Sequence, residues 1–234
     1  MSSEQRRRFP WILTVLSALA LAVLISLGVW QTQRLQWKQD LIARAEAAAE
    51  LPPAPLQDVV DGPDAEFRRV VVQCPGLAGA PWVELQSILD GEAGVRLVSL
   101  CRPGGAARPL LVDRGFVADT ISARPPRSES DEPVEITGVL RQVPAPGPFA
   151  PPPRDGRFYA RDQQAMAEAL GETGAVDARV LFAETSSNPE WAALRPSAPP
   201  AAFSNDHLGY ALTWFGLAIV LAVFYGALLR RRRR

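Results

Sequence analysis

Two long stretches without charge constrain this chain more than any other feature. No charged residue lies between Arg8 and Arg34, and none lies between Asp206 and Arg230. Each stretch is long enough to cross a bilayer as a helix, which needs about 20 mostly apolar residues. The sequence therefore predicts two transmembrane helices that flank one large domain outside the membrane.

Basic residues at both ends predict the orientation of these helices. Arg6–Arg8 precede the first apolar stretch, and Arg230–Arg234 follow the second. Because Lys and Arg next to a membrane span remain on the cytoplasmic side, we expect both termini inside the cell. A cleaved secretory signal is the alternative at the N-terminus. The run Trp11–Val29 is longer than a signal core of roughly 7–15 residues and has no clear cleavage site at its end, which favours an uncleaved anchor.

The sequence thus predicts a multi-pass protein of the bacterial inner (plasma) membrane, with its main domain in the periplasm. The first helix is expected to continue beyond the membrane until Pro52 and Pro53 end it. The predicted parts are a cytoplasmic tail (1–10), a first transmembrane helix (11–30), a periplasmic α+β domain (31–205), a second transmembrane helix (206–229) and a cytoplasmic arginine tail (230–234).

The balanced overall charge conceals an asymmetry. Eight of the 25 basic residues, but one of the 25 acidic residues, lie at the two ends, so the central domain carries a formal charge of −7. An acidic domain argues against nucleic acid as a partner. The arginine tail is interpreted as a topology signal that also meets the headgroups of anionic lipids.

The central domain has the pattern of a β-rich fold. Short segments rich in branched residues alternate with Gly and Pro, which favours an antiparallel sheet or a small open barrel. One short helix is expected where Asp162 caps the segment QQAMAEAL and Gly171 ends it. The predicted strands are Phe67–Cys74, Trp82–Leu85, Val95–Cys101, Leu110–Val112, Val134–Arg141 and Arg179–Thr185.

Two cysteines, Cys74 and Cys101, lie in this domain. An oxidising periplasm allows a disulfide between them, and two separate buried thiols are an equal alternative. They form no CxxC motif and no histidine or methionine cluster accompanies them, so a metal or redox role is a minor alternative.

No arrangement typical of an enzyme is present in the sequence. A Ser/His/Asp or Cys/His site needs a base, and the single histidine lies at the predicted membrane edge, far from either cysteine. No glycine-rich stretch matches a phosphate-binding loop. The sequence therefore argues against a hydrolase or transferase and predicts that the protein is not an enzyme.

The tripeptide Asp113-Arg114-Gly115 follows the apolar strand Leu110–Val112. Gly115 permits a sharp turn or a bulge at this point. We interpret the acid and the base as a structural ion pair at a strand end, and a ligand contact is the alternative.

His207 stands where the second apolar stretch begins, and on a helix it shares a face with Tyr210 and Trp214. An ionisable residue at a membrane span suggests a functional site. Imidazole beside aromatic rings suits an iron macrocycle. The alternative is an interfacial histidine bonded to headgroups or to Asn205 or Asp206.

Sequence blocks at both membrane boundaries carry a family resemblance. The first reads Leu27-Gly28-Val29-Trp30-Gln31, followed by Arg34-Leu35 and Trp37-Lys38. The second runs from Asn205 to Phe215 with the pattern N-x-H-x-x-Y-A-x-T-W-F. Three more blocks lie between them in the expected order: Phe67–Val70, Val112–Phe116 and Gly138–Arg141. Together they resemble the Surfeit locus protein 1 family, over nearly the whole chain.

This resemblance implies an assembly factor for cytochrome c oxidase that aids maturation of the subunit carrying haem a. It implies His207 as an axial ligand of transiently bound haem a, with Tyr210 and Trp214 flanking the ring. Trp30 and Gln31 would form the opposing wall. The expected partners are the haem-bearing oxidase subunit, enzymes of haem a biosynthesis and membrane lipid.

Two other functions compete with haem delivery. A membrane-anchored scaffold would hold the nascent oxidase subunit through its spans and its acidic sheet, without haem. An envelope protein unrelated to respiration is the more distant alternative. Replacing His207 separates a haem carrier from a scaffold, because a scaffold should tolerate the change.

Overall fold

The computed structural model describes residues 10–104, 108–196 and 205–233. The chain divides into two compact units, which are described separately. Residues 1–43 and 202–234 make up the first unit, and residues 44–201 make up the second. The predicted N-terminal tail lies almost entirely outside the described residues, as does the end of the arginine tail.

The first unit contains α4 (His207–Arg233) and most of α1 (Trp11–Glu50). Both helices are long and apolar enough to cross a membrane. The mean hydropathy of the most apolar window is 2.6 in α1 and 2.2 in α4. Only 6% of each window is buried, so most of their apolar side chains face outward. As expected, α1 continues well past the apolar stretch and ends just before Pro52 and Pro53.

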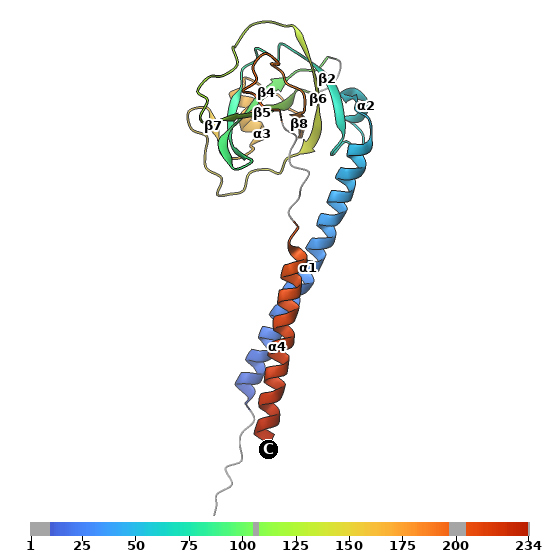
Figure 1. Cartoon of the computed structure of the whole chain (residues 1–234), viewed down its shortest axis with the longest axis vertical. Coiled ribbons are helices and arrows are strands. Elements are labelled where there is room, and N and C mark those ends of the chain that lie inside the picture. Colours follow the sequence, from blue (N-terminus) through green and yellow to red (C-terminus); the bar gives the residue numbers. More distant parts are fainter. Residues whose placement is uncertain (1–9, 105–107, 197–204, 234) are drawn as a thin grey trace, which may run out of the picture. The chain divides into compact units, whose positions relative to one another are not determined.

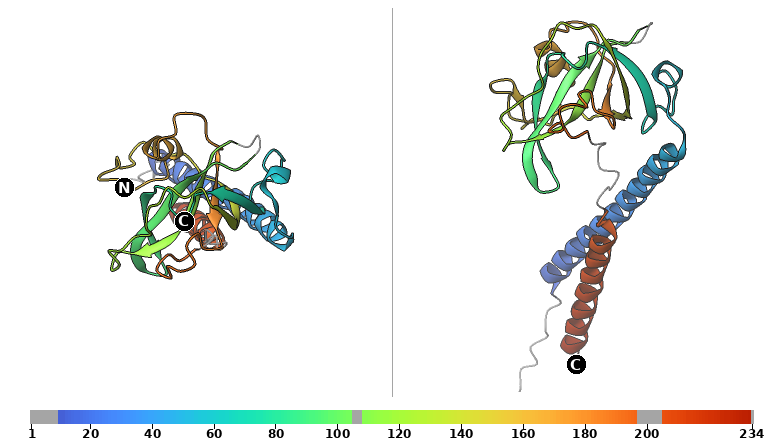
Figure 2. Two further views of the ribbon diagram at one scale, coloured as in Figure 1. Left: turned by 90° about the horizontal axis from the view of Figure 1, so that it is seen from above. Right: turned by 45° about the horizontal axis from the view of Figure 1, so that its top comes forward.

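The two helices lie side by side and antiparallel (Figures 1 and 2). Thr14 near the start of α1 shares a hydrogen bond with Tyr225 near the end of α4. In the middle, the Phe215 ring packs on Gly28, where a Cβ atom would lie 2.6 Å from the ring. Glycine therefore permits the close approach of the helices at this level, as small residues do in membrane helix pairs.

The second unit is built on one mixed sheet, whose strands within the described residues follow the order β1-β2-β6-β8-β5-β4-β3-β7. Neighbouring strands are antiparallel except in the pairs β1–β2, β3–β7 and β5–β8, which are parallel. Their bounds are β1 (Ala54–Pro55), β2 (Arg69–Pro75), β3 (Val83–Leu89), β4 (Glu92–Cys101), β5 (Leu110–Ala118), β6 (Pro133–Gln142), β7 (Arg157–Phe158) and β8 (Arg179–Ala183).

Hydrophobic side chains cover both faces of this sheet. Along β5, Leu110 and Val112 belong to one buried cluster, whereas Leu111 between them belongs to another. Successive side chains of a strand point to opposite faces, so the two clusters lie on opposite sides of the sheet. All nine residues of β5 are buried, which makes it the central strand of the core.

The structure confirms the predicted fold class and contains all six predicted strands. The predicted strand Leu110–Val112 extends to Ala118, because the polar residues Asp113 and Arg114 are buried within it rather than placed after its end. The short elements β1, β7 and the one-turn helix α2 (Leu56–Val59) were not predicted from the sequence. Within the predicted antiparallel sheet or open barrel, the pairs β1–β2, β3–β7 and β5–β8 are parallel.

The short helix of the domain forms as predicted. It is α3 (Gln163–Ala169), and its N-terminal cap is Asp162, whose carboxylate accepts a hydrogen bond from Ala165 N at 3.0 Å. Gly171 follows with a φ of 83°, a conformation that favours glycine and ends a helix.

Candidate functional site

His207 lies at the start of α4 and meets α1 through Gln31. The His207 Nδ1 atom is 2.6 Å from the Gln31 Oε1 atom. Gln31 is 9% exposed, although it is polar and belongs to an apolar helix. A buried amide is costly unless it is hydrogen-bonded, so this contact accounts for the burial of Gln31.

The hydrogen bond decides which imidazole nitrogen carries the proton. A carboxamide oxygen can accept a hydrogen but cannot donate one, so the hydrogen in this bond belongs to Nδ1 of His207. In the neutral ring, the Nε2 atom then carries a lone pair. This arrangement resembles the way in which metal-binding histidines are held, with one nitrogen bonded to a protein acceptor and the other directed to a metal.

Trp30 also contacts the imidazole ring of His207. The two ring centroids are 6.4 Å apart at an interplanar angle of 81°, an edge-to-face contact. Trp30 is 53% exposed, so part of its surface remains open. The structure thus brings together three of the predicted site residues, Trp30, Gln31 and His207, from two helices that are far apart in sequence.

Tyr210 and Trp214 follow His207 on α4, one and two turns further along. In the part of the chain that the structure describes, neither makes a hydrogen bond or ring contact with His207. Tyr210 is 57% exposed and Trp214 is half-buried. Their position on the predicted helix is confirmed, whereas their predicted role beside a bound ring remains a prediction.

A buried acceptor without a partner lies close to His207 in the chain. The Oδ1 atom of Asn205 is buried and has no hydrogen-bond partner among the described residues. Unsatisfied buried acceptors are uncommon in folded proteins and often mark a place where a ligand or water binds. Asn205 was considered as a hydrogen-bond partner of His207, and the contact of His207 is with Gln31 instead.

A bare metal ion has no evident site in the described residues, since no group of three or more His, Cys, Asp or Glu side chains comes together there. A single imidazole whose Nε2 makes no hydrogen bond within the described residues fits a different requirement. An iron macrocycle already supplies four nitrogen ligands and needs one or two axial ligands from the protein. The donor set present at His207 therefore fits haem better than a free metal ion.

The predicted ion pair between Asp113 and Arg114 is wrong. Both residues lie within β5, and their side chains point to opposite faces. Asp113 is fully buried, and its Oδ2 atom accepts hydrogen bonds from Arg96 Nε at 2.6 Å and Arg161 Nη2 at 2.9 Å. Arg96 and Arg161 were missed by the sequence analysis, because a strand pattern does not show which distant strands become neighbours.

Arg114 is also fully buried, and its partners in the described residues are neutral. Its guanidinium donates to the Ser187 and Ser99 hydroxyls at 2.8 and 3.2 Å and to the Ala78 carbonyl at 3.1 Å. It also donates to Asn188 Oδ1. Burial lowers the pKa of Arg114 to about 10, so it remains protonated at neutral pH. Arg114 thus holds two loops against β5 through hydrogen bonds.

Gly115 takes part in the predicted bulge. Leu97 of β4 pairs with Gly115 and Val98 pairs with Asp113, so Arg114 is the extra residue, and Gly115 beside it has a φ of 135°. A Cβ atom here would lie 2.5 Å from the Arg195 carbonyl oxygen. The backbone of Arg195 pairs with Phe116 through two hydrogen bonds of 2.8 and 2.9 Å. These residues are structural, and they fix the segment that follows β8.

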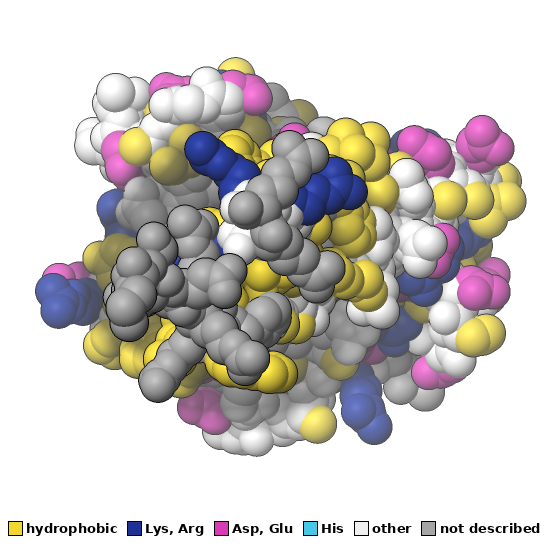
Figure 3. All heavy atoms as spheres, turned by 90° about the horizontal axis from the view of Figure 1, so that it is seen from below, with side chains coloured by type: hydrophobic (Ala, Val, Ile, Leu, Met, Phe, Trp, Pro, Cys, Tyr) yellow, Lys and Arg dark blue, Asp and Glu magenta, His cyan; other side chains and the backbone are white. Residues whose placement is uncertain are grey.

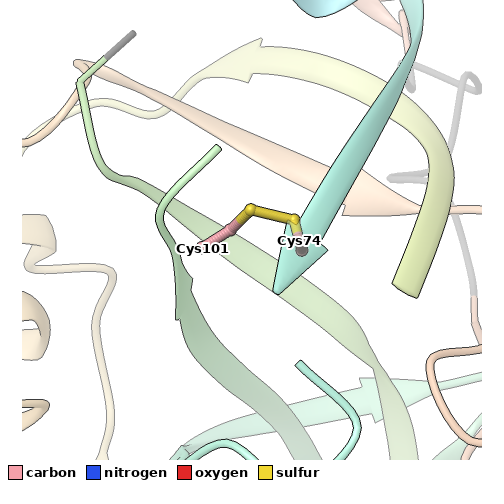
Figure 4. The surroundings of a disulfide bond; sticks show 2 residues. All are labelled: Cys74 and Cys101. Carbon is pink, nitrogen blue, oxygen red and sulfur yellow. A yellow bond between two sulfur atoms is a disulfide. The ribbon is translucent and has the colours of Figure 1, made fainter. Parts of the chain in front are cut away.

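Cys74 and Cys101 form a disulfide, which decides between the two alternatives left open by the sequence (Figure 4). It joins β2 to the end of β4, and both residues are at most 1% exposed. A buried disulfide between strands is a structural crosslink, and thiol reagents reach it only after local unfolding.

Comparison with known proteins agrees with this architecture. A model of the SURF1 family matches residues 18–219. Surfeit locus protein 1 of Mus musculus is 27% identical over 240 residues, which cover 92% of this chain and 74% of that protein. The SURF1-like protein of Monosiga brevicollis is 29% identical over 238 residues, or 90% of this chain and 84% of that protein. Since the family model matches both helices and the sheet domain between them, the protein belongs to the SURF1 family.

Proposed function

We propose that this protein is an assembly factor for cytochrome c oxidase that binds haem a transiently and aids its insertion into the haem-bearing oxidase subunit. Membership of the SURF1 family and two membrane-length helices support an assembly role at the membrane. The observation that carries the haem proposal is the hydrogen bond between His207 Nδ1 and Gln31 Oε1.

Each residue of this group has a defined task in the proposal. The Nε2 atom of His207 would hold the haem iron, and Gln31 would keep the ring in the required tautomer. Trp30 provides an aromatic wall at the edge of the imidazole ring. The exposed Tyr210 and the half-buried Trp214 would offer further aromatic surface on the same helix for the macrocycle. The apolar outer faces of α1 and α4 suit the hydrocarbon tail of the haem.

A single protein ligand suits a carrier. One histidine donor would hold the iron less firmly than two, which would favour release of the cargo. The proposal requires no catalytic residue. Neighbouring groups of this chain orient the cargo and shield it, and the chemistry of oxygen reduction belongs to the mature oxidase.

The proposed location is the bacterial inner membrane, with both termini in the cytoplasm and the sheet domain in the periplasm. Arginines next to both spans support this orientation. The Cys74–Cys101 disulfide supports it independently, because such bonds persist in oxidising compartments and are rare in the cytosol. His207 and Gln31 would then lie near the outer surface of the membrane.

Complementation separates this function from its rivals. The gene is deleted in its host, and either the wild-type chain or His207→Ala is restored at equal membrane abundance. Haem a content and oxidase activity of the membranes are then measured. A carrier predicts recovery with the wild type and little recovery with His207→Ala. Full recovery with His207→Ala would favour the scaffold, and unchanged oxidase in the deletion strain would remove the protein from oxidase assembly.

A further inference from the structure

A groove on the surface of α4 ends at two arginines. Its volume is about 590 Å³, and successive lining residues are alternately one and three positions apart, which places them along one face of the helix. They are Ala222, Val223, Gly226, Ala227, Arg230 and Arg231. Small side chains leave room along the helix, so the groove has an apolar floor and a basic end.

Within the described residues, no carboxylate balances the positive charge at this end. Arg230 and Arg231 are exposed, and within the described residues neither forms an ion pair with a carboxylate. The sequence has no acidic residue after Asp206, and arginines occupy every position from 230 to 234. In the space-filling view from below, basic side chains lie among hydrophobic ones (Figure 3). The end of α4 is therefore complementary to a negatively charged ligand.

This end of the helix pair also has the features of a membrane surface. Thr14 contacts Tyr225, so the start of α1 lies beside the last turns of α4. Trp11 stands at the start of α1 and is 70% exposed. Tryptophan prefers the boundary between headgroups and hydrocarbon. The arginines that end the groove thus lie at the level where lipid phosphates are found.

We propose that this groove binds one anionic phospholipid. Arg230 and Arg231 hold the headgroup phosphate, and one acyl chain lies along Ala222, Gly226 and Val223. From Ala222 to Arg230 the helix rises about 12 Å, which accommodates the upper half of a typical acyl chain. This site is at the opposite end of α4 from His207, so it does not depend on the proposed haem function.

The arginines and the apolar part of the groove contribute separately to lipid binding, and a separate variant tests each contribution. Arg231→Gln removes one charge that lines the groove. Arg232→Gln removes one charge from the neighbouring position, which does not line it. Gly226→Leu keeps every charge and fills the groove, and a Cβ atom at Gly226 meets no other atom within 4 Å. The helix should therefore tolerate all three changes.

The full-length protein is reconstituted in nanodiscs that contain equal amounts of phosphatidylglycerol and phosphatidylcholine, and retained lipids are counted by native mass spectrometry. We expect the wild type to retain one phosphatidylglycerol preferentially. Arg231→Gln and Gly226→Leu should each reduce this preference about fivefold, and Arg232→Gln should change it less than twofold. Equal losses for Arg231→Gln and Arg232→Gln, or no loss for Gly226→Leu, would reduce the effect to diffuse charge attraction and overturn the proposal.

Discussion

Asp113 and Arg114 are adjacent in β5, yet their side chains lie on opposite faces of the sheet and enter separate hydrogen-bond networks. Asp113 neutralises part of the charge of Arg96 and Arg161, whereas Arg114 is held by hydroxyl, amide and carbonyl groups. Two buried charged groups in one central strand are costly, so the stability of the sheet depends on the partners that each network supplies.

Replacing Asp113 with Asn should destabilise the sheet domain strongly. The change leaves Arg96, whose side chain is 8% exposed, beside a neutral amide in the core. Loss of one partner from a buried pair costs about 3 kcal/mol or more. Chemical denaturation of the full chain in detergent measures this loss.

The matched control for Asp113 is Glu92→Gln, which breaks the exposed pair between Glu92 and Arg195. Those side chains are 42% and 45% exposed, so the expected loss is below about 1 kcal/mol. Equal effects of the two substitutions would show that the Asp113 network does not stabilise the sheet.

Glu84 should contribute a pH-dependent part of the stability. Burial raises the pKa of Glu84, but hydrogen bonds and charges from Arg124 and Arg157 outweigh it and leave the pKa below its ordinary value of 4.5. At pH values between the lowered pKa of the folded state and the ordinary pKa of the unfolded state, the unfolded chain binds more protons than the folded one. Stability therefore rises with pH across this interval. The contribution is present above pH 4.5 and is lost as pH falls through the folded pKa.

The measurement for Glu84 compares the unfolding free energies of the wild type and Glu84→Gln across this range. The difference should be less than about 1 kcal/mol at neutral pH, because the group is partly exposed, and should shrink on acidification. Glu129→Gln serves as the control, since Glu129 is exposed and forms no ion pair within the described residues. A Glu84 difference that grows with acid would contradict the assignment.

Reduction of the Cys74–Cys101 disulfide should destabilise the sheet domain by about 3.5 kcal/mol, because the bond closes a loop with a sequence separation of 27 residues. Unfolding of the wild type with and without reductant measures the effect. The double variant Cys74→Ala, Cys101→Ala should be insensitive to reductant. Identical wild-type curves in both conditions would mean that the crosslink adds no stability.

Gln31→Leu should weaken haem binding about tenfold, because it removes the acceptor that fixes the imidazole of His207. Gln31→Glu should retain haem and lower its reduction potential, since a charged acceptor makes the imidazole a stronger donor. Haem titrations and redox titrations provide the two readouts. Gln33→Leu is the control two positions away, on the exposed side of α1. Equal losses from Gln31→Leu and Gln33→Leu would show that Gln31 has no positioning role.

The sequence predicted those features that depend on local pattern. The length of the two uncharged stretches predicted α1 and α4. Segments of branched residues between Gly and Pro predicted the six main strands, and Asp162 together with Gly171 predicted α3. Two-residue strands carry no such pattern, so β1 and β7 were missed. The parallel pairing of β5 with β8 depends on contacts between distant segments, which a single sequence does not show.

The candidate site was predictable in composition but not in geometry. The rarity of histidine and its place beside an apolar stretch drew attention to His207. The family resemblance placed Gln31 opposite His207, but the hydrogen bond between them could not be deduced, because Gln31 lies 176 residues earlier in the chain. The ion pair between Asp113 and Arg114 was predicted because the two residues are adjacent in the sequence. The strand proved longer than predicted, and neighbouring residues within a strand point to opposite faces of the sheet.

The most direct test of the account is the visible spectrum of the protein purified in mild detergent from cells that make haem a, beside His207→Ala at equal yield. The account predicts a haem band in the wild type, its loss in the variant, and partial return when imidazole is added. A band of equal intensity in both proteins would place the haem elsewhere and contradict His207 as its ligand. Absence of the band from both would leave the scaffold as the better account.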